Sequence, residues 1–382
     1  MKIGLVLDDS LDKPDGVQQY VLTIGTWLKS IGYEVRYLAG STKRTDIQGL
    51  YSLSNNLGVQ FNRNKLSIPV QASSSRIKQV LNDEKFDVLH VQLPHSPLMS
   101  GKLVRYTPAS TAVVGTFHIL PYSRMVEGAT KLLGKINNKN LQKFDEICSV
   151  SSPAQEFARH SMGIESACIP NAINIEAFSG AKALARFNNS FNIVFLGRLV
   201  QRKGAMQLLK AITQLVKKTE IPNLRVLICG DGSELFKLRD YVKNNSLDKI
   251  VSFEGFIPEN QKASYLASAN IAVFPSLGGE SFGIVLVEAM ASGAGVVLGG
   301  DNPGYRSVLE TDQRALFRAD NSSELSELLH HLIRDKELLR QISSSQKELV
   351  KKYDVQVVGP QILDMYKRAI EKRNQKIDNK RK

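Results

Sequence analysis

Cysteine is scarce in this chain of 382 residues, and the three that occur, Cys148, Cys168 and Cys229, lie far apart in the sequence. None belongs to a CxxC motif or has a histidine-rich neighbourhood, so the sequence supports neither a disulfide framework nor a zinc site. A reducing cytoplasm is therefore the expected compartment. The chain also has no GxGxxG fingerprint in a suitable place, which argues against a nicotinamide-dependent dehydrogenase.

Long uncharged apolar runs are also missing. The longest apolar segment, residues 282–298, is interrupted by an acid, a serine and glycines, which makes it unsuitable as a membrane span. At the N-terminus the apolar residues 3–7 are followed directly by Asp8 and Asp9, which break the pattern of a signal peptide. We expect a protein that can touch a membrane without crossing it.

Acidic residues are outnumbered, because 50 Lys and Arg stand against 37 Asp and Glu and give a formal charge of +13. Such a surface favours anionic partners, among them nucleic acid, phospholipid headgroups and nucleotides. About half of the excess lies in residues 367–382, with eight basic residues and two acids. This tail is interpreted either as a solvated helix end or as an anchor for anionic lipid, where each basic residue adds about 1 kcal/mol.

Short apolar runs rich in Val, Ile and Leu alternate with segments of helical spacing. Continuous apolar runs are typical of buried parallel strands, because helices cover both faces of such a sheet. The first series comprises residues 3–7, 34–38, 87–91, 112–117 and 146–150, and the second comprises residues 192–196, 224–229, 250–253, 271–274 and 295–298. Because the alternation of strands and helices begins again in the second series, the sequence predicts an α/β protein with two Rossmann-like, doubly wound domains.

The boundary between the two series falls in a stretch of weak periodicity. It includes the sequence Ile-Pro-Asn-Ala-Ile-Asn at residues 169–174 and a polar segment at 179–190 with many small residues. We expect an N-terminal domain over residues 1–172 and a C-terminal domain over 173–355, followed by a C-terminal helix and basic tail over 356–382.

Gly16 lies where the first predicted strand gives way to a helix. A glycine at such a turn lets backbone N–H groups approach a phosphate at the positive end of the helix dipole. A purely structural turn glycine is the alternative interpretation.

Three cations, Arg198, Arg202 and Lys203, occur between Gly197 and Gly204, directly after the first strand of the second series. In an open α/β sheet, ligands bind at the carboxyl ends of the strands. Arg198 and Lys203 could flank a pyrophosphate and neutralise a departing nucleoside diphosphate. Solvated surface cations are the alternative.

Residues 278–290, with the sequence Gly-Gly-Glu-Ser-Phe-Gly-Ile-Val-Leu-Val-Glu-Ala-Met, combine two acids with an apolar helix. Glu280 precedes the helix and Glu288 lies eight residues later, so both can sit on one side of the segment. A buried carboxylate needs a donor, and sugar or ribose hydroxyls are suitable, although such an acid can also be a satisfied structural residue. The N–H groups that could receive phosphate oxygens at the helix start are those of Phe282, Gly283, Ile284 and Val285.

The two acids of residues 278–290, the cations of residues 198–203 and the turn at Gly16 together resemble the retaining glycosyltransferases of family 4, which have the GT-B fold with two domains facing a central cleft. Residues 16–18 and 116–118 add a similarity to bacterial phosphatidylinositol mannosyltransferases within that family. Those enzymes transfer mannose from GDP-mannose to a membrane phosphoinositide.

The resemblance implies a role for each candidate residue. Glu280 and His118 would be catalytic and contact the transferred hexose, and Glu288 would bind ribose hydroxyls. The remaining donor-binding residues would be Gly16, Arg198, Arg202, Lys203, Gly230, Ile257, Pro258, Lys262, Phe282, Gly283, Ile284 and Val285. The resemblance also implies a front-face displacement that retains the anomeric configuration, and no residue cluster in the sequence calls for a metal.

The acceptor side departs from the family pattern. Gln18 is retained, but Asp9 stands where an aromatic residue is expected, and an acid there would repel a lipid phosphate. Asn62 and Arg63 keep a polar acceptor loop without the usual Tyr-Asn pair. These changes leave the donor residues in place and leave the acceptor open.

The amphipathic segment 73–81, which the resemblance places at the membrane, carries only Arg76 and Lys78, and an ordinary surface helix is the alternative. The hypothesis is a retaining hexosyltransferase, cytoplasmic and peripheral on the inner face of the cell membrane, with GDP-mannose as donor and phosphatidylinositol as acceptor. One alternative uses a UDP-sugar to glycosylate diacylglycerol, another lipid or a polysaccharide. Another is an inactive basic protein that binds membrane or nucleic acid, whereas the enzyme is expected to bind no nucleic acid.

Overall fold

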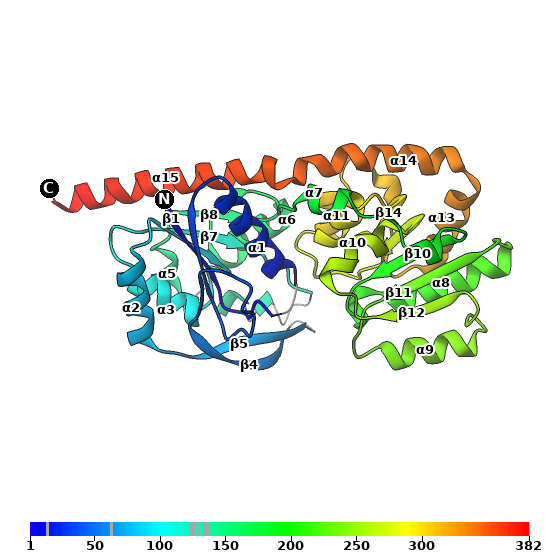
Figure 1. Cartoon of the computed structure of the whole chain (residues 1–382), viewed down its shortest axis with the longest axis horizontal. Helices are drawn as coiled ribbons and strands as arrows, with labels where there is room; N and C mark the ends of the chain where they lie inside the picture. The colour runs from blue at the N-terminus through cyan, green and yellow to red at the C-terminus, as the bar shows by residue number, and fades with distance from the viewer. Residues whose placement is uncertain (13–14, 62–63, 123–126, 129, 133–136, 382) are drawn as a thin grey trace. The chain divides into compact units, whose positions relative to one another are not determined.

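The computed structural model describes residues 1–12, 15–61, 64–122, 127–128, 130–132 and 137–381 (Figure 1). The chain forms two compact units, of which the first combines Met1–Ala172 with Val355–Lys382 and the second is Ile173–Asp354. The C-terminal segment therefore groups with the N-terminal unit.

The first unit is built on a seven-stranded parallel sheet in the order β3-β2-β1-β6-β7-β8-β9. Its strands are β1 (Lys2–Leu7), β2 (Glu34–Ala39), β3 (Leu50–Ser52), β6 (Val88–Gln92), β7 (Ala112–Phe117), β8 (Glu146–Ser149) and β9 (Ala167–Cys168). Its helices include α1 (Gly16–Ser30), α2 (Ser74–Glu84), α3 (Met99–Tyr106), α5 (Asn138–Leu141), α6 (Ser152–Met162) and α15 (Val355–Arg381). An antiparallel hairpin, β4 (Ser54–Phe61) with β5 (Asn64–Ala72), stands outside the sheet.

Both faces of this sheet bury apolar side chains, because successive residues of a strand point to opposite faces. Leu5 belongs to one core cluster with Ile24 of α1, and the next residue, Val6, belongs to another with Ile77 of α2 and Leu103 of α3. The continuous apolar runs of the sequence are thus explained by helices on both sides.

The second unit contains a six-stranded parallel sheet in the order β12-β11-β10-β13-β14-β15. Its strands are β10 (Phe191–Leu196), β11 (Leu224–Cys229), β12 (Val251–Gly255), β13 (Ile271–Phe274), β14 (Val296–Gly300) and β15 (Leu316–Phe317). Its helices include α7 (Ile175–Ser179), α8 (Ala205–Lys218), α9 (Leu235–Asn244), α10 (Glu259–Ala267), α11 (Ile284–Ala291), α12 (Pro303–Val308), α13 (Ser322–Arg334) and α14 (Lys336–Leu349). The strand order reverses between β10 and β13, which is where doubly wound sheets bind ligands.

The ten predicted strands and the doubly wound fold class are confirmed, with strand ends that shift by one or two residues. The strands that the sequence did not reveal are short or polar: β3, β4, β5, β9 and β15. Two- and three-residue strands carry too few residues for a period to be seen, and the hairpin is paired to itself rather than buried in a parallel sheet.

Helix α15 completes the core of the first unit. Figure 1 shows it running beside the β7 and β8 region. Met365 and Tyr366 are fully buried, and the Tyr366 hydroxyl lies 2.7 Å from Nδ1 of His90, a buried residue of β6. The C-terminal helix is therefore an integral part of this unit.

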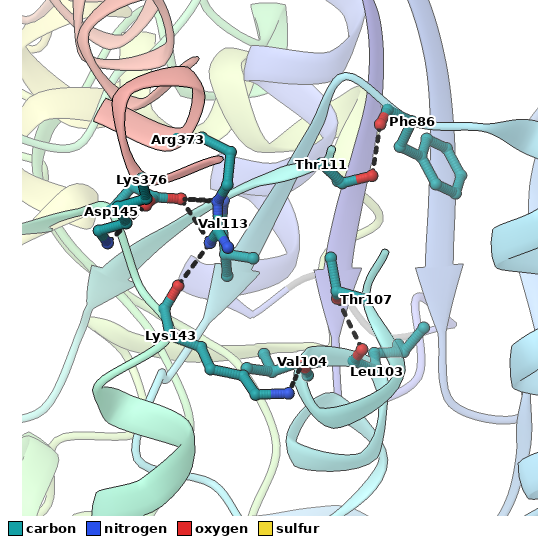
Figure 2. Close-up of polar contacts among 10 residues, drawn as sticks. All are labelled: Phe86, Leu103, Val104, Thr107, Thr111, Val113, Lys143, Asp145, Arg373 and Lys376. Atoms are coloured by element: carbon teal, nitrogen blue, oxygen red, sulfur yellow. Dashed lines mark hydrogen bonds and ion pairs between the residues drawn. The ribbon is translucent and has the colours of Figure 1, made fainter. Parts of the chain in front are cut away.

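A buried acid, Asp145, fastens the end of α15 (Figure 2). Its Oδ2 accepts from Nε and Nη2 of Arg373 at 2.9 and 2.7 Å and from the backbone N–H of Val113 at 2.9 Å, and its Oδ1 accepts from Lys376 at 2.8 Å. Other tail cations are paired as well: Lys372 and Arg368 with Glu146, and Lys367 with Asp364. Much of the basic tail is therefore neutralised by the protein's own acids.

We expect Arg373→Met to destabilise the first unit by about 1–3 kcal/mol, because it removes charged hydrogen bonds to a buried carboxylate. Arg340→Met, which breaks an exposed ion pair with Glu337 on α14, is the matched control and should leave stability unchanged. Urea unfolding of both variants measures the difference. Equal unfolding midpoints would contradict a fastening role for Asp145.

Candidate functional site

The loop after β10 carries the cations that the sequence analysis singled out. Residues Gln201–Lys203 form a single 3-10 turn, and Gly204 follows with a φ of +74°. A Cβ at Gly204 would lie 1.9 Å from the carbonyl oxygen of Pro275, so only glycine lets this loop approach the end of β13. The two loops at the strand-order reversal are thereby brought into contact.

Glu280, in the loop after β13, is the centre of this contact. Its Oε1 accepts from Arg202 at 2.6 Å, Ser276 at 2.7 Å and Lys203 at 2.9 Å. No donor among the described residues contacts Oε2. One carboxylate oxygen is therefore fixed by three donors of the protein.

Electrostatics keep Glu280 ionised. Burial raises the pKa of its carboxyl, but Lys203 and Arg202 outweigh burial and lower the pKa to about 2. Burial lowers the pKa of Lys203, although the Glu280 carboxylate opposes this. Arg198, a third cation, lies in the same loop and is half-buried.

Glu288 lies on α11 and is almost fully buried. Its Oε1 accepts from Nζ of Lys262 at 2.8 Å, and the same ammonium contacts Glu259 at 2.8 Å. Burial raises the pKa of Glu288, and the two carboxylates overcome burial to raise the pKa of Lys262. The donor that this buried acid requires is therefore supplied at Oε1 by a lysine of the protein, and the role of Glu288 at ribose hydroxyls stays a prediction.

The N-terminus of α11 has no side-chain cap. Gly283 precedes the helix with a φ of +142°, and a Cβ there would lie 2.7 Å from the ring of Tyr305. Ile284 and Val285 begin the helix and are half-buried, whereas Phe282 lies before it and packs on Tyr353 at 5.3 Å between ring centroids. Uncapped N–H groups at a helix start form a ready site for a phosphate.

The other donor candidates of the second unit also lie after strands. Gly230 directly follows β11, and Ile257 and Pro258 connect β12 to the helix that carries Lys262. Ile257 is half-buried and Pro258 is exposed. The sheet thus gathers the second-unit donor candidates at the carboxyl ends of β10, β11, β12 and β13.

Three candidates of the first unit follow its own strand β1. Gly16 is the first residue of α1, and its N–H donates to Asp15 Oδ1 at 2.8 Å. Gln18, on the same helix, donates from Nε2 to Oδ2 of Asp9 at 3.1 Å. Gln18 and Asp9 are thus brought together, whereas Asn62 and Arg63 lie outside the described residues.

His118 follows β7 in the first unit and is 9% exposed. Its Nε2 lies 2.7 Å from Oε1 of Gln92, and its ring meets the edge of Tyr20 at 5.1 Å. Burial, with a smaller contribution from His90, lowers the pKa of His118 to about 3. The imidazole is therefore neutral at physiological pH.

Sequence reasoning missed Ser276 and Gln92, which bond directly to the two proposed catalytic side chains, and it missed that Lys262 pairs with Glu288. Ser276 comes two residues after β13 and Gln92 ends β6, so a search for polar residues at strand ends could have found both. The Lys262 pair has no such signal, because its partner is on another helix.

No group of three or more His, Cys, Asp or Glu in the described part of the chain is arranged to hold a metal ion. Across the described ranges, no helix is both long enough and apolar enough to span a membrane.

The fold has close structural counterparts. HepE of Anabaena, solved in complex with UDP-glucose, superposes with a TM-score of 0.76 at 18% identity, covering 95% of this chain and 98% of that chain. Two doubly wound parallel-sheet units of this kind define a GT-B protein.

Sequence comparisons give the family. The model "Glycosyltransferase Family 4" matches residues 14–177 and "Glycosyl transferases group 1" matches residues 181–349. The phosphatidyl-myo-inositol mannosyltransferase of Mycolicibacterium smegmatis is 31% identical over 96% of this chain and 93% of that protein. The alpha-monoglucosyldiacylglycerol synthase of Acholeplasma laidlawii is 23% identical over the full length of both. The chain belongs to the family 4 glycosyltransferases.

The depressed pKa of Glu280 predicts a pH dependence of stability. The group titrates near its ordinary 4.5 when unfolded and at about 2 when folded, so its contribution is complete above pH 4.5 and is lost as the pH falls toward 2. We expect wild type to exceed Glu280→Gln in stability by about 1–3 kcal/mol at pH 6.

Urea unfolding at pH 6, 5, 4 and 3 measures this difference, which should shrink below pH 4.5. Glu348→Gln, which removes an exposed acid of α14, is the matched control. A difference between wild type and Glu280→Gln that stays constant down to pH 3 would contradict the assignment.

Proposed function

We propose that this protein is a retaining hexosyltransferase that transfers mannose from GDP-mannose to a membrane lipid such as phosphatidylinositol. The observation that carries the proposal is the state of Glu280, whose Oε1 is held by three donors while Oε2 has none among the described residues. An ionised, immobile carboxylate oxygen suits a sugar hydroxyl. It stands beside the basic loop that follows β10, and the cations of that loop suit the diphosphate of a nucleotide sugar.

The roles of the donor residues follow from their charges. Arg198 and Lys203 neutralise the leaving diphosphate, and the uncapped N–H groups of Ile284 and Val285 receive its oxygens. Glu288 binds the ribose, and Gly230, Ile257, Pro258 and Lys262 surround the base. The acceptor oxygen bonds to the anomeric carbon on the same face from which the diphosphate leaves, so the anomeric configuration is retained. Charge stabilisation and positioning supply the catalysis.

Two observations bear on the acceptor. The mycobacterial relative carries phosphatidyl-myo-inositol and mannose in its name, which supports the lipid and the sugar proposed here. The carboxylate of Asp9, which is paired with Gln18, would repel a lipid phosphate. The relative named for monoglucosyldiacylglycerol supports a neutral lipid as the second candidate, for which we propose a UDP-sugar as donor. The transfer assay separates these two candidates.

Purified protein incubated with labelled GDP-mannose or UDP-glucose and a total lipid extract should produce one labelled lipid. Glu280→Gln should lower transfer at least a hundredfold, because a neutral amide replaces the oxygen that holds the hexose. The exposed variant Glu348→Gln should match wild type.

Mass analysis of the product identifies the acceptor and the sugar. Two results together would refute the proposal: no labelled lipid from either donor, and no rise in melting temperature with GDP or UDP, since a ligand of the native state must stabilise it.

We also propose that the enzyme works as a peripheral protein on the inner face of the cell membrane, through a basic surface on α2 and α3. Lys78 lies 4.7 Å from the ring centroid of Tyr106, so the two helices meet at this surface. Arg76, Lys78 and Arg105 are exposed, and Lys102 is half-buried. Five cations of the C-terminal tail are paired with acids, whereas none of these four cations forms an ion pair with an acid in the described part of the chain.

The double variant Lys78→Glu/Arg105→Glu should weaken binding to vesicles of phosphatidylcholine and phosphatidylserine by at least tenfold, because each cation near an anionic surface contributes about 1 kcal/mol. Lys210→Glu/Lys217→Glu changes two exposed lysines of α8 and is the charge-matched control. Co-sedimentation measures both. Equal losses would assign the attraction to net charge alone.

A further inference from the structure

Gln92 and His118 lie side by side because their strands are neighbours in the sheet. Gln92 ends β6 and is paired in register with Thr116 of β7, two residues before His118. Side chains two residues apart in a strand share a face, so His90 and Gln92 line the same face as Thr116, and His118 follows directly after β7. The pairing of Gln92 with His118 is therefore set by the strand register.

The two polar atoms of the Gln92 side-chain amide differ in their hydrogen bonding. Its side chain is 1% exposed, and Oε1 lies 2.7 Å from Nε2 of His118. Its Nε2 is buried and has no hydrogen-bond partner within the described part of the chain. A buried amide nitrogen left unpaired is unfavourable, and a role confined to packing does not explain it. A ligand oxygen would satisfy it.

The carbonyl oxygen of Gln92 decides which nitrogen of His118 carries the proton. A neutral imidazole has one N–H donor and one acceptor nitrogen, and the hydrogen bond at one nitrogen fixes the role of the other. Because Oε1 can only accept, Nε2 of His118 carries the proton and Nδ1 keeps a lone pair. The low pKa of His118, about 3 through burial and then His90, keeps the ring neutral.

The groups packed against His118 hold it in one place. Tyr20 of α1 meets the ring edge-on at 5.1 Å, and on β6 the neighbours are Gln92 and His90. His90 is itself held at both nitrogens, by the Tyr366 hydroxyl at 2.7 Å and Thr116 Oγ1 at 2.6 Å. No carboxylate takes part in these contacts, so the tautomer of His118 depends on the Gln92 amide.

We propose that Gln92 is a positioning residue that holds His118 as the Nε2–H tautomer, so that Nδ1 accepts a hydrogen bond from a hydroxyl of the transferred hexose. The same amide offers its unpaired Nε2 to an oxygen of that ligand. This inference rests on the proposed role of His118 at the hexose, and the two are separated by measuring the tautomer without any turnover.

Nitrogen-15 NMR of histidine-labelled protein reports the tautomer of each of the six histidines, and His118→Ala assigns the signal. Wild type should show His118 as Nε2–H alone, and Gln92→Met should show a mixture. Gln92→Glu keeps an acceptor at Oε1, so it should restore the single tautomer and raise the pKa of His118 by at least one unit. A wild-type Nδ1–H signal, or an unchanged signal in Gln92→Met, would overturn the inference.

Kinetics supply the second measurement. Gln92→Met should lower kcat by about ten- to a hundredfold with a smaller effect on KM, because a misplaced proton weakens a bond needed in the transition state. Gln92→Glu should recover part of kcat, but kcat should stay below the wild-type value because the variant lacks the Nε2 donor. The acidic limb of its pH profile should shift to higher pH.

The matched control is Gln346→Met, which removes another buried glutamine, one that bonds the backbone of Val297 in the second unit. It should keep the His118 tautomer and the wild-type kcat. A mixed tautomer in Gln92→Met together with wild-type kinetics would also overturn the inference. If wild type transfers no hexose at all, the proposed function fails, whereas the NMR result still decides whether Gln92 sets the tautomer.

Discussion

The ion pair between Glu280 and the cations after β10 is the interaction on which the second unit's site depends. It joins two loops that the strand-order reversal places next to each other, and the tight approach at Gly204 makes the contact possible. Low exposure strengthens the attraction, so the carboxylate stays ionised in spite of burial. Under the proposed function the same cations would hold both the carboxylate and the diphosphate, which would couple the sugar-binding oxygen to the charge that binds the leaving group.

In the first unit, the hydrogen-bonded side chains around His118 are neutral groups rather than ions. His90, Thr116 and Tyr366 form a buried hydrogen-bonded row beneath His118, and burial lowers the pKa of His90 to about 3. Because Tyr366 comes from α15, the last helix of the chain contributes to the surroundings of a residue that follows β7. A site built in this way depends on which atom carries each proton, and small changes in hydrogen bonding can alter it.

The ion pairs of the structure change which cations are available to a partner. In the sequence, the basic tail supplies about half of the excess positive charge. In the structure, Arg373 and Lys376 of this tail bind the buried Asp145 and fasten α15 to the first unit. The cations of α2 and α3 are fewer, but Arg76, Lys78 and Arg105 are exposed. Net charge therefore predicts an anionic partner, whereas only the ion pairs show which part of the chain can meet it.

The sequence by itself determined the two parallel sheets, because continuous apolar runs at regular spacing have few other stable arrangements. It also placed Arg202 and Lys203 after a strand and Glu280 before a helix. Only the tertiary structure decided which groups pair. Arg202 and Glu280 are 78 residues apart, and Lys262 reaches Glu288 across two helices. Such contacts are fixed by strand order and helix packing, and the short-range periodicity of the sequence does not predict them.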